Sequence, residues 1–272
     1  MKKHPEYFQF KQFRIYHDQC ALKVGTDGVL LGAWSKLPEK KDTGNTISVL
    51  DIGCGTGLVS IMLAQRYPFA IIKGIDIDYQ SINQAKANAA ISPWSDRISF
   101  EISDARTYRH SISPQKSYDA IVSNPPFYEE DMLPLSKREA IAKHTNTLPL
   151  DQLAQTASCL LKPEFGLFNV ILPSAIFHRF ISKAEQYGLY LTCITRVMTS
   201  PQRPCKRVLL CFKNSKKCPD HVTFNNMPLS GNGPHGRSKE YELLTQDFYL
   251  SSNPQLSSSA SFLRLNVLSS LN

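Results

Sequence analysis

A glycine-rich loop between a buried strand and a helix is the feature of this sequence that most constrains its fold. In VLDIGCGTGLVSIMLAQR (Val49 to Arg66), apolar and β-branched residues lead through Gly53, Gly55 and Gly57 into a helix with periodic apolar positions. Glycines at a strand-to-helix turn let the backbone approach a ligand closely at the helix N-terminus. Leu58 stands where a dinucleotide loop of the GxGxxG type needs its third glycine, so the pattern is D-x-G-x-G-x-G. A tight turn without a ligand would also use these glycines, and other residues must decide between the two interpretations.

Short β-branched or aromatic runs alternate with longer helical segments through most of the chain. The predicted strands are Ile47 to Ile52, Ala70 to Ile77, Ile98 to Ile102, Tyr118 to Ser123, Gly166 to Leu172, Tyr190 to Val197 and Arg207 to Lys213. The predicted helices are Leu58 to Arg66, Gln80 to Ala90, Leu150 to Leu161 and Ser174 to Tyr187. This alternation predicts a doubly wound α/β fold, a mostly parallel sheet with helices on both faces. About ten residues join the last two strands, too few for a crossover helix, so these strands should form an antiparallel hairpin at the edge of the sheet.

The sequence divides into three segments. Residues 1–45 form an N-terminal extension that holds the apolar stretch Cys20 to Trp34 and most of a polar linker, Ser35 to Thr46. Residues 46–250 form the predicted α/β domain. Residues 251–272 form a tail with eight serines and a single charge, Arg264. We expect this tail to be loosely held, although its leucines could pack as a short appended element.

The composition narrows the choice of partners and compartment. Thirty-one Lys and Arg against 23 Asp and Glu give a formal charge of +8 and a pI near 9.1, which favours a polyanionic partner such as nucleic acid. Seven cysteines without a CxxC pair argue against a disulfide scaffold or a zinc site. The basic N-terminus has no apolar h-region, and no stretch approaches the roughly 18 apolar residues of a membrane span. We therefore expect a cytoplasmic protein that enters no membrane and binds no metal.

Three aspartates lie at the ends of successive predicted strands. Asp51 directly precedes the glycine loop, Asp76 lies nineteen residues after Gly57, and Asp104 follows the third strand in ISFEISDA. In a doubly wound sheet, ligands bind at the carboxyl ends of the strands. The Asp76 carboxylate can accept hydrogen bonds from both hydroxyls of a ribose, and Asp104 could face an adenine. Together with the glycine loop, these residues predict an adenosine-type ligand.

The tetrapeptide Asn124-Pro125-Pro126-Phe127 follows the fourth predicted strand. Two prolines fix the backbone and remove two N–H donors, so the loop presents carbonyl oxygens and the Asn124 amide oxygen as acceptors. Asn124 Oδ1 and the Pro125 carbonyl can hold the two hydrogens of a planar exocyclic amine, and Phe127 can stack on the ring that bears it. Methyl transfer then needs that nitrogen aimed in line at a sulfonium methyl, so positioning supplies most of the catalysis. Alone, the tetrapeptide would be an ordinary proline turn. Combined with the glycine loop, it predicts an amino methyltransferase.

Longer segments of the chain resemble a known family. They are FKQFRIYHDQCALKVGTDGVLLGAW (Phe10 to Trp34), VLDIGCGTGLVSIMLAQR, SPWSDRI (Ser92 to Ile98), SNPPFY and YELLTQDFYL (Tyr241 to Leu250). With these segments the chain resembles the class I S-adenosylmethionine-dependent methyltransferases, which have a Rossmann-like sheet and an [N/D]-P-P-[Y/F] motif. More narrowly, it resembles the bacterial tRNA1(Val) (adenine-37-N6)-methyltransferases over about residues 7–250. Phe127 stands where Tyr is common, and the tail after Leu250 is an extension that the family usually lacks.

The resemblance implies S-adenosylmethionine as the cofactor. The segment with Lys23, Gly25, Thr26 and Asp27 resembles a lid over it, although Thr26 or Asp27 also fits a helix N-cap. By the same resemblance, Gly53, Gly55 and Gly57 would lie along the methionine part of the cofactor. Asp76 would lie at the ribose, and Asp104 with Ala105 at the adenine. The remaining expected cofactor contacts are Asp51, Cys54, Ile77 and Asn124. The residues Asn124, Pro125, Pro126 and Phe127 would hold the target base.

Seven basic residues and no acid lie between Arg196 and Lys217. A charge run of this kind is often a solvated face. Its place at the predicted hairpin, in a chain with surplus positive charge, favours phosphate contacts, and we predict tRNA binding by Arg203, Lys206 and Arg207. The loop after the tetrapeptide is a second candidate, with Lys137, Arg138, Lys143 and His144. His144 would be structural or contact phosphate, because methylation of an adenine amine does not require a general base.

Three other functions compete with the tRNA interpretation. A protein glutamine amide is also a planar nitrogen that NPP[Y/F] loops serve, but enzymes of that kind usually carry a separate N-terminal helical domain, for which residues 1–45 are too short. A DNA adenine methyltransferase remains an alternative. A non-catalytic RNA-binding protein of this fold would have lost the glycine loop or the NPP motif, and both are intact. We expect a monomeric enzyme that methylates the N6 amine of adenine 37 in tRNA-Val.

Overall fold

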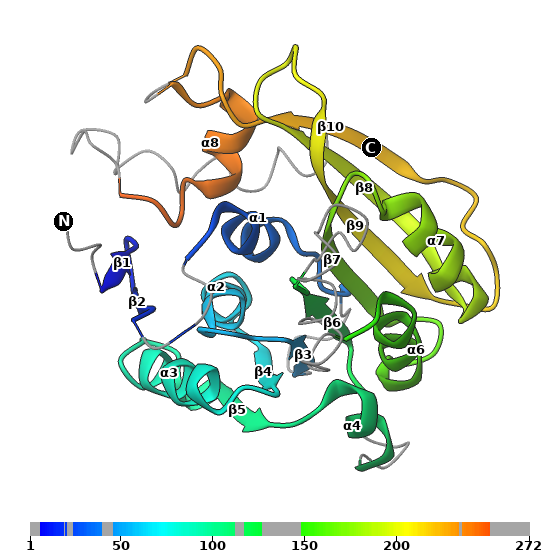
Figure 1. The fold of residues 1–272 in the computed structure, drawn as a ribbon, viewed down its shortest axis with the longest axis horizontal. Coiled ribbons are helices and arrows are strands. Elements are labelled where there is room, and N and C mark those ends of the chain that lie inside the picture. The colour runs from blue at the N-terminus through cyan, green and yellow to red at the C-terminus, as the bar shows by residue number, and fades with distance from the viewer. Residues whose placement is uncertain are drawn as a thin grey trace, which may run out of the picture.

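An eight-stranded sheet forms the centre of the protein (Figure 1). The computed structural model describes residues 6–18, 20, 24–39, 46–111, 117–126, 148–233 and 236–250. The strands of the sheet are β3 (Ile47–Ile52), β4 (Ala70–Asp76), β5 (Ile98–Ile102), β6 (Ala120–Ser123), β7 (Leu167–Pro173), β8 (Leu189–Met198), β9 (Cys205–Asn214) and β10 (Thr223–Pro228). Their spatial order is β10-β8-β9-β7-β6-β3-β4-β5, and only β9 runs antiparallel to its neighbours. The predicted doubly wound, mostly parallel sheet is confirmed.

The predicted antiparallel hairpin is present, but it does not lie at the edge of the sheet. The strands β8 and β9 pair from Leu189 opposite Asn214 to Met198 opposite Cys205. Strand β10 pairs parallel with β8 and takes the edge position. The predicted edge position is wrong because β10 lacks the alternating apolar pattern of a strand. Its first four residues are all exposed, and Met227 is its one buried residue.

Helices cover both faces of the sheet (Figure 1). One face carries α1 (Thr26–Trp34), α2 (Leu58–Arg66), α3 (Tyr79–Ala90) and α8 (Lys239–Thr245), and the other carries α4 (Ala105–Ser111), α6 (Leu150–Leu160) and α7 (Phe177–Gln186). A small hairpin of β1 (Tyr7–Gln9) and β2 (Arg14–Tyr16) lies beside α3, and a 3-10 turn, η1 (Ser95–Arg97), precedes β5. The four predicted helices are confirmed, with ends shifted by at most three residues. The sequence patterns did not predict α4, α8 or the small hairpin, and of α1 they indicated only a start near Thr26 or Asp27.

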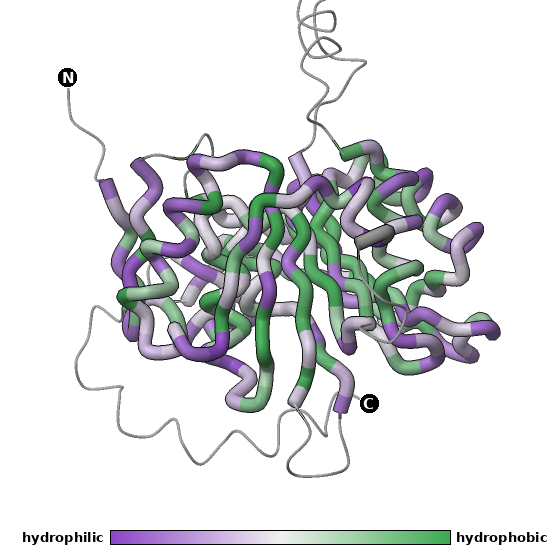
Figure 2. Tube along the Cα trace, turned by 90° about the horizontal axis from the view of Figure 1, so that it is seen from below, coloured by the Kyte–Doolittle hydropathy of each residue, from purple (hydrophilic) through white to green (hydrophobic). Residues whose placement is uncertain are grey.

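The strands are apolar because the sheet is buried on both faces. Along β3, Val49 packs with residues of α1 and α2, whereas the next residue, Leu50, packs with residues of α6. Successive side chains of a strand point to opposite faces, so a strand covered on both sides has to be apolar at nearly every position. Figure 2 shows the resulting hydrophobic strands running through the middle of the molecule.

Helix α1 packs directly on α2 and belongs to the α/β body. A Cβ atom at Gly32 would meet Met62 Sδ at 2.7 Å, so only glycine permits this close approach. The N-cap of α1 is Gly25, with extended backbone and no side-chain cap. The predicted N-cap at Thr26 or Asp27 is therefore wrong, because both residues already lie in the first turn of the helix.

Two further predictions concern the whole chain. In the ranges that the structure describes, no helix is long and apolar enough to cross a bilayer. The serine-rich tail, residues 251–272, lies outside the described residues. The division of the chain into an extension, a domain and a tail stays a prediction.

Candidate cofactor and substrate site

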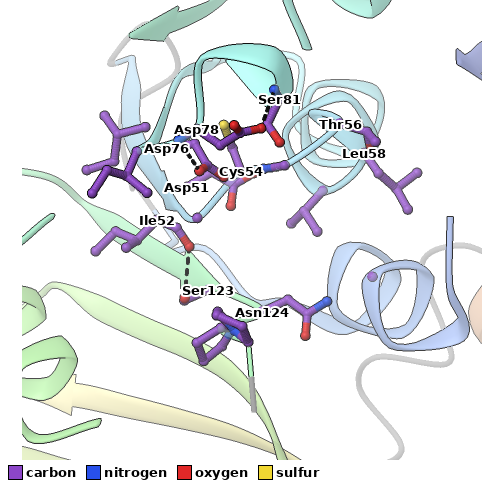
Figure 3. Close-up of a pocket in the computed structure, with 18 of the residues that line it drawn as sticks. Asp51, Ile52, Cys54, Thr56, Leu58, Asp76, Asp78, Ser81, Ser123 and Asn124 are labelled. Carbon is purple, nitrogen blue, oxygen red and sulfur yellow. Dashed lines mark hydrogen bonds between the residues drawn. The ribbon is translucent and has the colours of Figure 1, made fainter. Parts of the chain in front are cut away.

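A cavity of about 910 Å³ opens at the carboxyl ends of β3, β4 and β6 (Figure 3). Parallel strands end at the same edge of the sheet, so loops far apart in the sequence meet there. The volume lies within the range of about 300 to 1,000 Å³ that is typical of small-molecule sites. Predicted site residues that line it are Gly25, Thr26, Asp27, Asp51, Gly53, Cys54, Gly55, Asp76, Ile77, Asp104, Ala105, Asn124, Pro125 and Pro126.

The three glycines of the loop have different structural roles. Gly53 and Gly55 have φ of +71° and +51°, and a Cβ atom at either position would meet nothing within 4 Å. Both line the cavity, so their backbone faces open space where a ligand can approach. Gly57 has φ of +78° and does not line the cavity, and a Cβ there would meet the Phe100 ring at 2.7 Å. Glycine is therefore needed at position 57 for the turn into α2 and for the close packing against β5.

Asp76 is anchored to the glycine loop. Its Oδ2 accepts a hydrogen bond from the Gly55 N–H at 2.9 Å, and its Oδ1 accepts one from the Asp78 N–H at 3.0 Å (Figure 3). A carboxylate has about four acceptor positions. Two therefore remain for a ligand in the cavity that Asp76 lines.

Asp51 is a buried carboxyl group in the wall of the cavity. It is 1% exposed, and the Ser60 hydroxyl donates a 2.7 Å hydrogen bond to its Oδ2. Burial raises the pKa of Asp51 to about 7, and the charge of Asp76 adds to the rise, against the lowering effect of the hydrogen bonds from Ser60. A positively charged ligand in the cavity would favour the ionised form. Burial also holds the pKa of the neighbouring Cys54 thiol well above its usual range, so this thiol stays protonated.

Asp104 forms an ion pair that sequence reasoning missed. The Arg106 guanidinium Nε donates to both carboxylate oxygens, at 2.9 and 2.8 Å, and the Arg106 N–H donates to Oδ1 at 2.9 Å. These hydrogen bonds lower the pKa of Asp104. Because both side chains line the cavity, the wall beside β5 presents a planar, paired guanidinium together with the predicted carboxylate.

Asn124 lies on the other side of the cavity from Asp76. The preceding Ser123 hydroxyl is buried and donates a 2.8 Å hydrogen bond to the Ile52 carbonyl, which fixes the end of β6 against the end of β3. The Asn124 side chain extends into the cavity toward α1 (Figure 3). Among the described residues it has no hydrogen-bond partner, so its amide is available to a ligand. Lys23, Phe127 and the loop with Lys137, Arg138, Lys143 and His144 lie outside the described residues.

Asn88 supports the glycine loop from behind, and the sequence analysis missed it. This fully buried residue of α3 donates from Nδ2 to the Thr56 and Tyr16 carbonyls, both at 2.9 Å, and accepts from the Tyr16 N–H at 2.9 Å. It thereby joins the β1–β2 hairpin to the loop. The buried side of α3 also holds Ser81 and Gln84, so no sequence signal singles out Asn88.

Comparison with known proteins identifies the family. A model described as "Methyltransferase small domain" matches residues 31–148. A relative from Phocaeicola vulgatus, named tRNA1(Val) (adenine(37)-N6)-methyltransferase, is 44% identical over 244 residues, which are 90% of this chain and 97% of the relative. The chain belongs to this methyltransferase family. A relative with the same name from Bacteroides thetaiotaomicron is 40% identical over 246 residues, again 90% of this chain and 97% of the relative.

A solved structure shows the same methyltransferase fold. It is that of a predicted O-methyltransferase from Agrobacterium tumefaciens, with a TM-score of 0.60 and 17% sequence identity. The match covers 82% of this chain and 96% of the other. At this identity the likeness concerns the fold alone.

The topology of this methyltransferase divides the predicted basic run into two groups. Strand β8 ends, and β9 begins, at the same edge of the sheet as the cavity, because β8 runs parallel to β7 through β9. Arg196, Arg203, Lys206 and Arg207 therefore lie toward the cavity edge, whereas Lys213, Lys216 and Lys217 lie toward the opposite edge. Arg207 already has a partner: its Nε donates to Asp27 Oδ2 at 2.8 Å.

A metal site was not expected in the methyltransferase. In the described part of the chain, no group of three or more His, Cys, Asp or Glu side chains could hold an ion. The expectation that the reaction needs no metal stays a prediction.

Proposed function

We propose that this chain transfers a methyl group from S-adenosylmethionine to the N6 amine of adenine 37 in the anticodon loop of tRNA1(Val). One observation carries the chemistry. The Asn124 amide, which has no hydrogen-bond partner in the described part of the chain, is followed by two prolines, lines the same cavity as the glycine loop and lies across it from Asp76. The relatives that bear the tRNA1(Val) (adenine(37)-N6)-methyltransferase name support the choice of substrate. We further propose a monomer that acts in the cytoplasm and uses no metal.

The cavity residues fit the cofactor. The open backbone at Gly53 and Gly55 accommodates the methionine part, and the two unused acceptor positions of Asp76 take the ribose hydroxyls. Ile77, Asp104 and Ala105 line the end of the cavity that would receive the adenine. The bound cofactor supplies an activated methyl group on a positively charged sulfur. The buried Asp51 carboxyl lies in the same wall, so its ionised form would stabilise that charge.

Asn124 and Pro125 orient the amine that is methylated. The Asn124 Oδ1 and Pro125 carbonyl oxygens accept the two N–H hydrogens, which holds the nitrogen in line with the methyl group. The amine nitrogen held by Asn124 and Pro125 would take the methyl group that the cofactor supplies, and it would release one proton to solvent. Such alignment turns a bimolecular reaction into an effectively unimolecular one, and a misplacement of about 1 Å can cost about a hundredfold in rate. Phe127 would stack on the target base.

A single-stranded RNA loop suits this site. The base of an anticodon loop can turn into the cavity without opening a duplex, which saves a few kcal/mol relative to double-stranded DNA. The net charge of +8 favours a polyanion, and the predicted contacts Arg203 and Lys206 are exposed toward the cavity edge. The third predicted contact, Arg207, is also at this edge but is ion-paired with Asp27.

A substrate competition tests the proposal. Purified enzyme and methyl-labelled cofactor are offered total tRNA, duplex DNA and a peptide-chain release factor side by side. We expect label in tRNA alone, and we expect it to be lost in Asn124→Ala. Label in the release factor alone would indicate glutamine methylation, and label in DNA alone would indicate a DNA adenine methyltransferase.

A further inference from the structure

The order of the strands determines where the body of the RNA can lie. Along the cavity edge, Asp76 ends β4, Asp51 lies next to the end of β3, and Asn124 follows β6. The next positions along this edge belong to β7, β9 and β8. Because the cofactor takes the β3–β4 side, an RNA whose base reaches Asn124 extends over β7 and β9. Neighbouring strands are about 4.8 Å apart, so β9 lies about 10 Å from β6.

Two exposed cations lie at this part of the edge. Arg179 is in the first turn of α7, directly after β7, and Lys206 is at the start of β9. Ser174, which follows β7, is joined to the start of β9, because its N–H donates to the Lys206 carbonyl at 3.1 Å and its hydroxyl donates to the Cys205 carbonyl at 2.7 Å. Lys206 has no partner on β8, since Val197 pairs with Arg207 and Met198 pairs with Cys205. Such a bulge re-aims a side chain away from the regular ladder.

Several exposed cations at this edge have no carboxylate partner among the described residues. Elsewhere in the described ranges, Lys73, Lys162 and Arg106 form ion pairs with carboxylates, as Arg207 does with Asp27. Arg179, Lys206 and a third cation, Arg203 of the β8–β9 loop, are all exposed. Their charged groups have no carboxylate partner among the described residues. Exposed cations without carboxylate partners are available to phosphate groups.

We propose that Arg179, Arg203 and Lys206 form a phosphate-binding surface for the RNA strand that flanks the target adenine. We call these three residues the rim surface. The proposal rests on the tRNA function above and adds Arg179, which no sequence pattern indicated. Lys206 is at the start of β9, about 10 Å from β6, so it would contact phosphates of the nucleotides that flank the target.

A pair of matched double variants tests the rim surface. Arg179→Ala with Lys206→Ala removes two rim charges, and Lys216→Ala with Lys217→Ala removes two exposed charges at the opposite edge of the sheet. Filter binding of tRNA is measured between 50 and 200 mM salt, where each phosphate contact contributes about 0.7 to 0.9 to the slope of log K against log salt. We expect the rim variant to lose about 1.4 to 1.8 of slope and the control variant to lose none. The KM for tRNA should rise in the rim variant, with kcat unchanged at saturating tRNA.

Two results would overturn the rim surface: an unchanged slope in the rim variant, or an equal loss in both variants. Circular dichroism and cofactor affinity check that each variant is folded. The methylation of tRNA by the wild-type enzyme is measured in a separate assay. A failure of the rim surface with intact wild-type methylation therefore leaves the proposed function standing.

A different observation assigns a role to Arg207. The Asp27 side chain lines the cavity from the first turn of α1, and Arg207 Nε holds it at 2.8 Å with the two side chains 30% and 37% exposed. We infer that Arg207 is a positioning residue that orients Asp27 toward the cofactor, in place of its predicted contact with RNA. The ion pair also joins α1 to β9. Asp27 and Arg207 are 180 positions apart in the sequence, and their contact stabilises one side of the cavity wall.

Cofactor affinity without RNA tests this role. Exposed ion pairs contribute about 0.5 to 1 kcal/mol, so Arg207→Ala should weaken S-adenosylmethionine binding by about two- to fivefold in calorimetry. In turnover assays with tRNA, the same change should raise the KM for the cofactor and leave kcat unchanged. Arg207→Lys should restore most of the affinity, and Arg207→Ala should have no further effect in an Asp27→Ala background. Unchanged affinity in Arg207→Ala, or additive effects in the double variant, would refute the positioning role.

Discussion

Replacement of Asp76 by alanine tests how the cofactor is held. Hydrogen bonds from Gly55 and Asp78 occupy one acceptor position on each Asp76 oxygen, which leaves two for the ribose hydroxyls. A hydrogen bond to a charged group contributes about 1.5 to 3 kcal/mol. Since the site is partly exposed, we expect Asp76→Ala to lose about 2 to 3 kcal/mol in total, which is about a 30- to 150-fold weaker Kd for S-adenosylhomocysteine in calorimetry.

Two controls separate the ribose contact from the support of the loop. Asp78→Ala removes a carboxylate two residues away whose Oδ2 caps α3 at the Ser81 N–H, 2.7 Å. It should lower the free energy of unfolding by about 1 kcal/mol and leave cofactor affinity near normal. In a 2′-deoxy analogue, removal of the 2′-hydroxyl from the ligand should weaken its binding to the wild type. The same removal should cause no additional loss of affinity in Asp76→Ala. An equal loss for the analogue in both proteins, or an unchanged Kd in Asp76→Ala, would refute the ribose assignment.

Three further perturbations have defined outcomes. Asn124→Ala should keep the fold and the cofactor Kd while lowering single-turnover methyl transfer by about a hundredfold, and a loss of only a few fold would contradict the role of its amide. Because burial raises the folded-state pKa of Asp51 to about 7 from 3.8, the folded protein binds more protons than the unfolded chain between these values, so stability should fall as the pH rises through this window. Asp51→Asn keeps an acceptor for Ser60 and should flatten that part of a Tm-against-pH profile, whereas parallel profiles would refute the assignment. Asn88→Ala removes three hydrogen bonds with backbone groups, one buried and two part-buried, and should cost about 3 kcal/mol in urea denaturation, and a loss below about 1 kcal/mol would show that these bonds matter little.

The parts of the fold that were predictable are those where burial imposes a pattern. Strands such as β3 and β7 are covered on both faces and have to be apolar at most positions, which the sequence shows directly. Strand β10 has a single buried residue, Met227, so its sequence carries no comparable pattern. Helix α1 is buried at six of its nine positions, from Gly28 to Ala33, so it appeared as an undivided apolar stretch without helical periodicity.

The site was predictable where one residue type is needed at one backbone position. The positive φ at Gly53 and Gly55 and the acidic end of β4 are local features, so the sequence alone indicates them. The partner of Asp27 was not foreseen, because its ion pair with Arg207 depends on the path of the chain between distant elements. The partner of Asp104 is Arg106, only two residues away, and it was missed although the contact is local. The seven basic residues from Arg196 to Lys217 looked like one group in the sequence but lie at two opposite edges of the sheet, because β9 separates them.

Mapping the methylated base in tRNA tests the central claim most directly. Valine tRNA is isolated from a strain that lacks this gene and from the same strain that carries either the wild-type gene or the Asn124→Ala variant. Ribonuclease fragments are then analysed by mass spectrometry. We predict an added methyl group on the fragment with adenine 37, recovered as N6-methyladenosine, with wild type alone. Valine tRNA that is unmodified at adenine 37 with the wild-type gene, or fully methylated there with Asn124→Ala, would contradict the account.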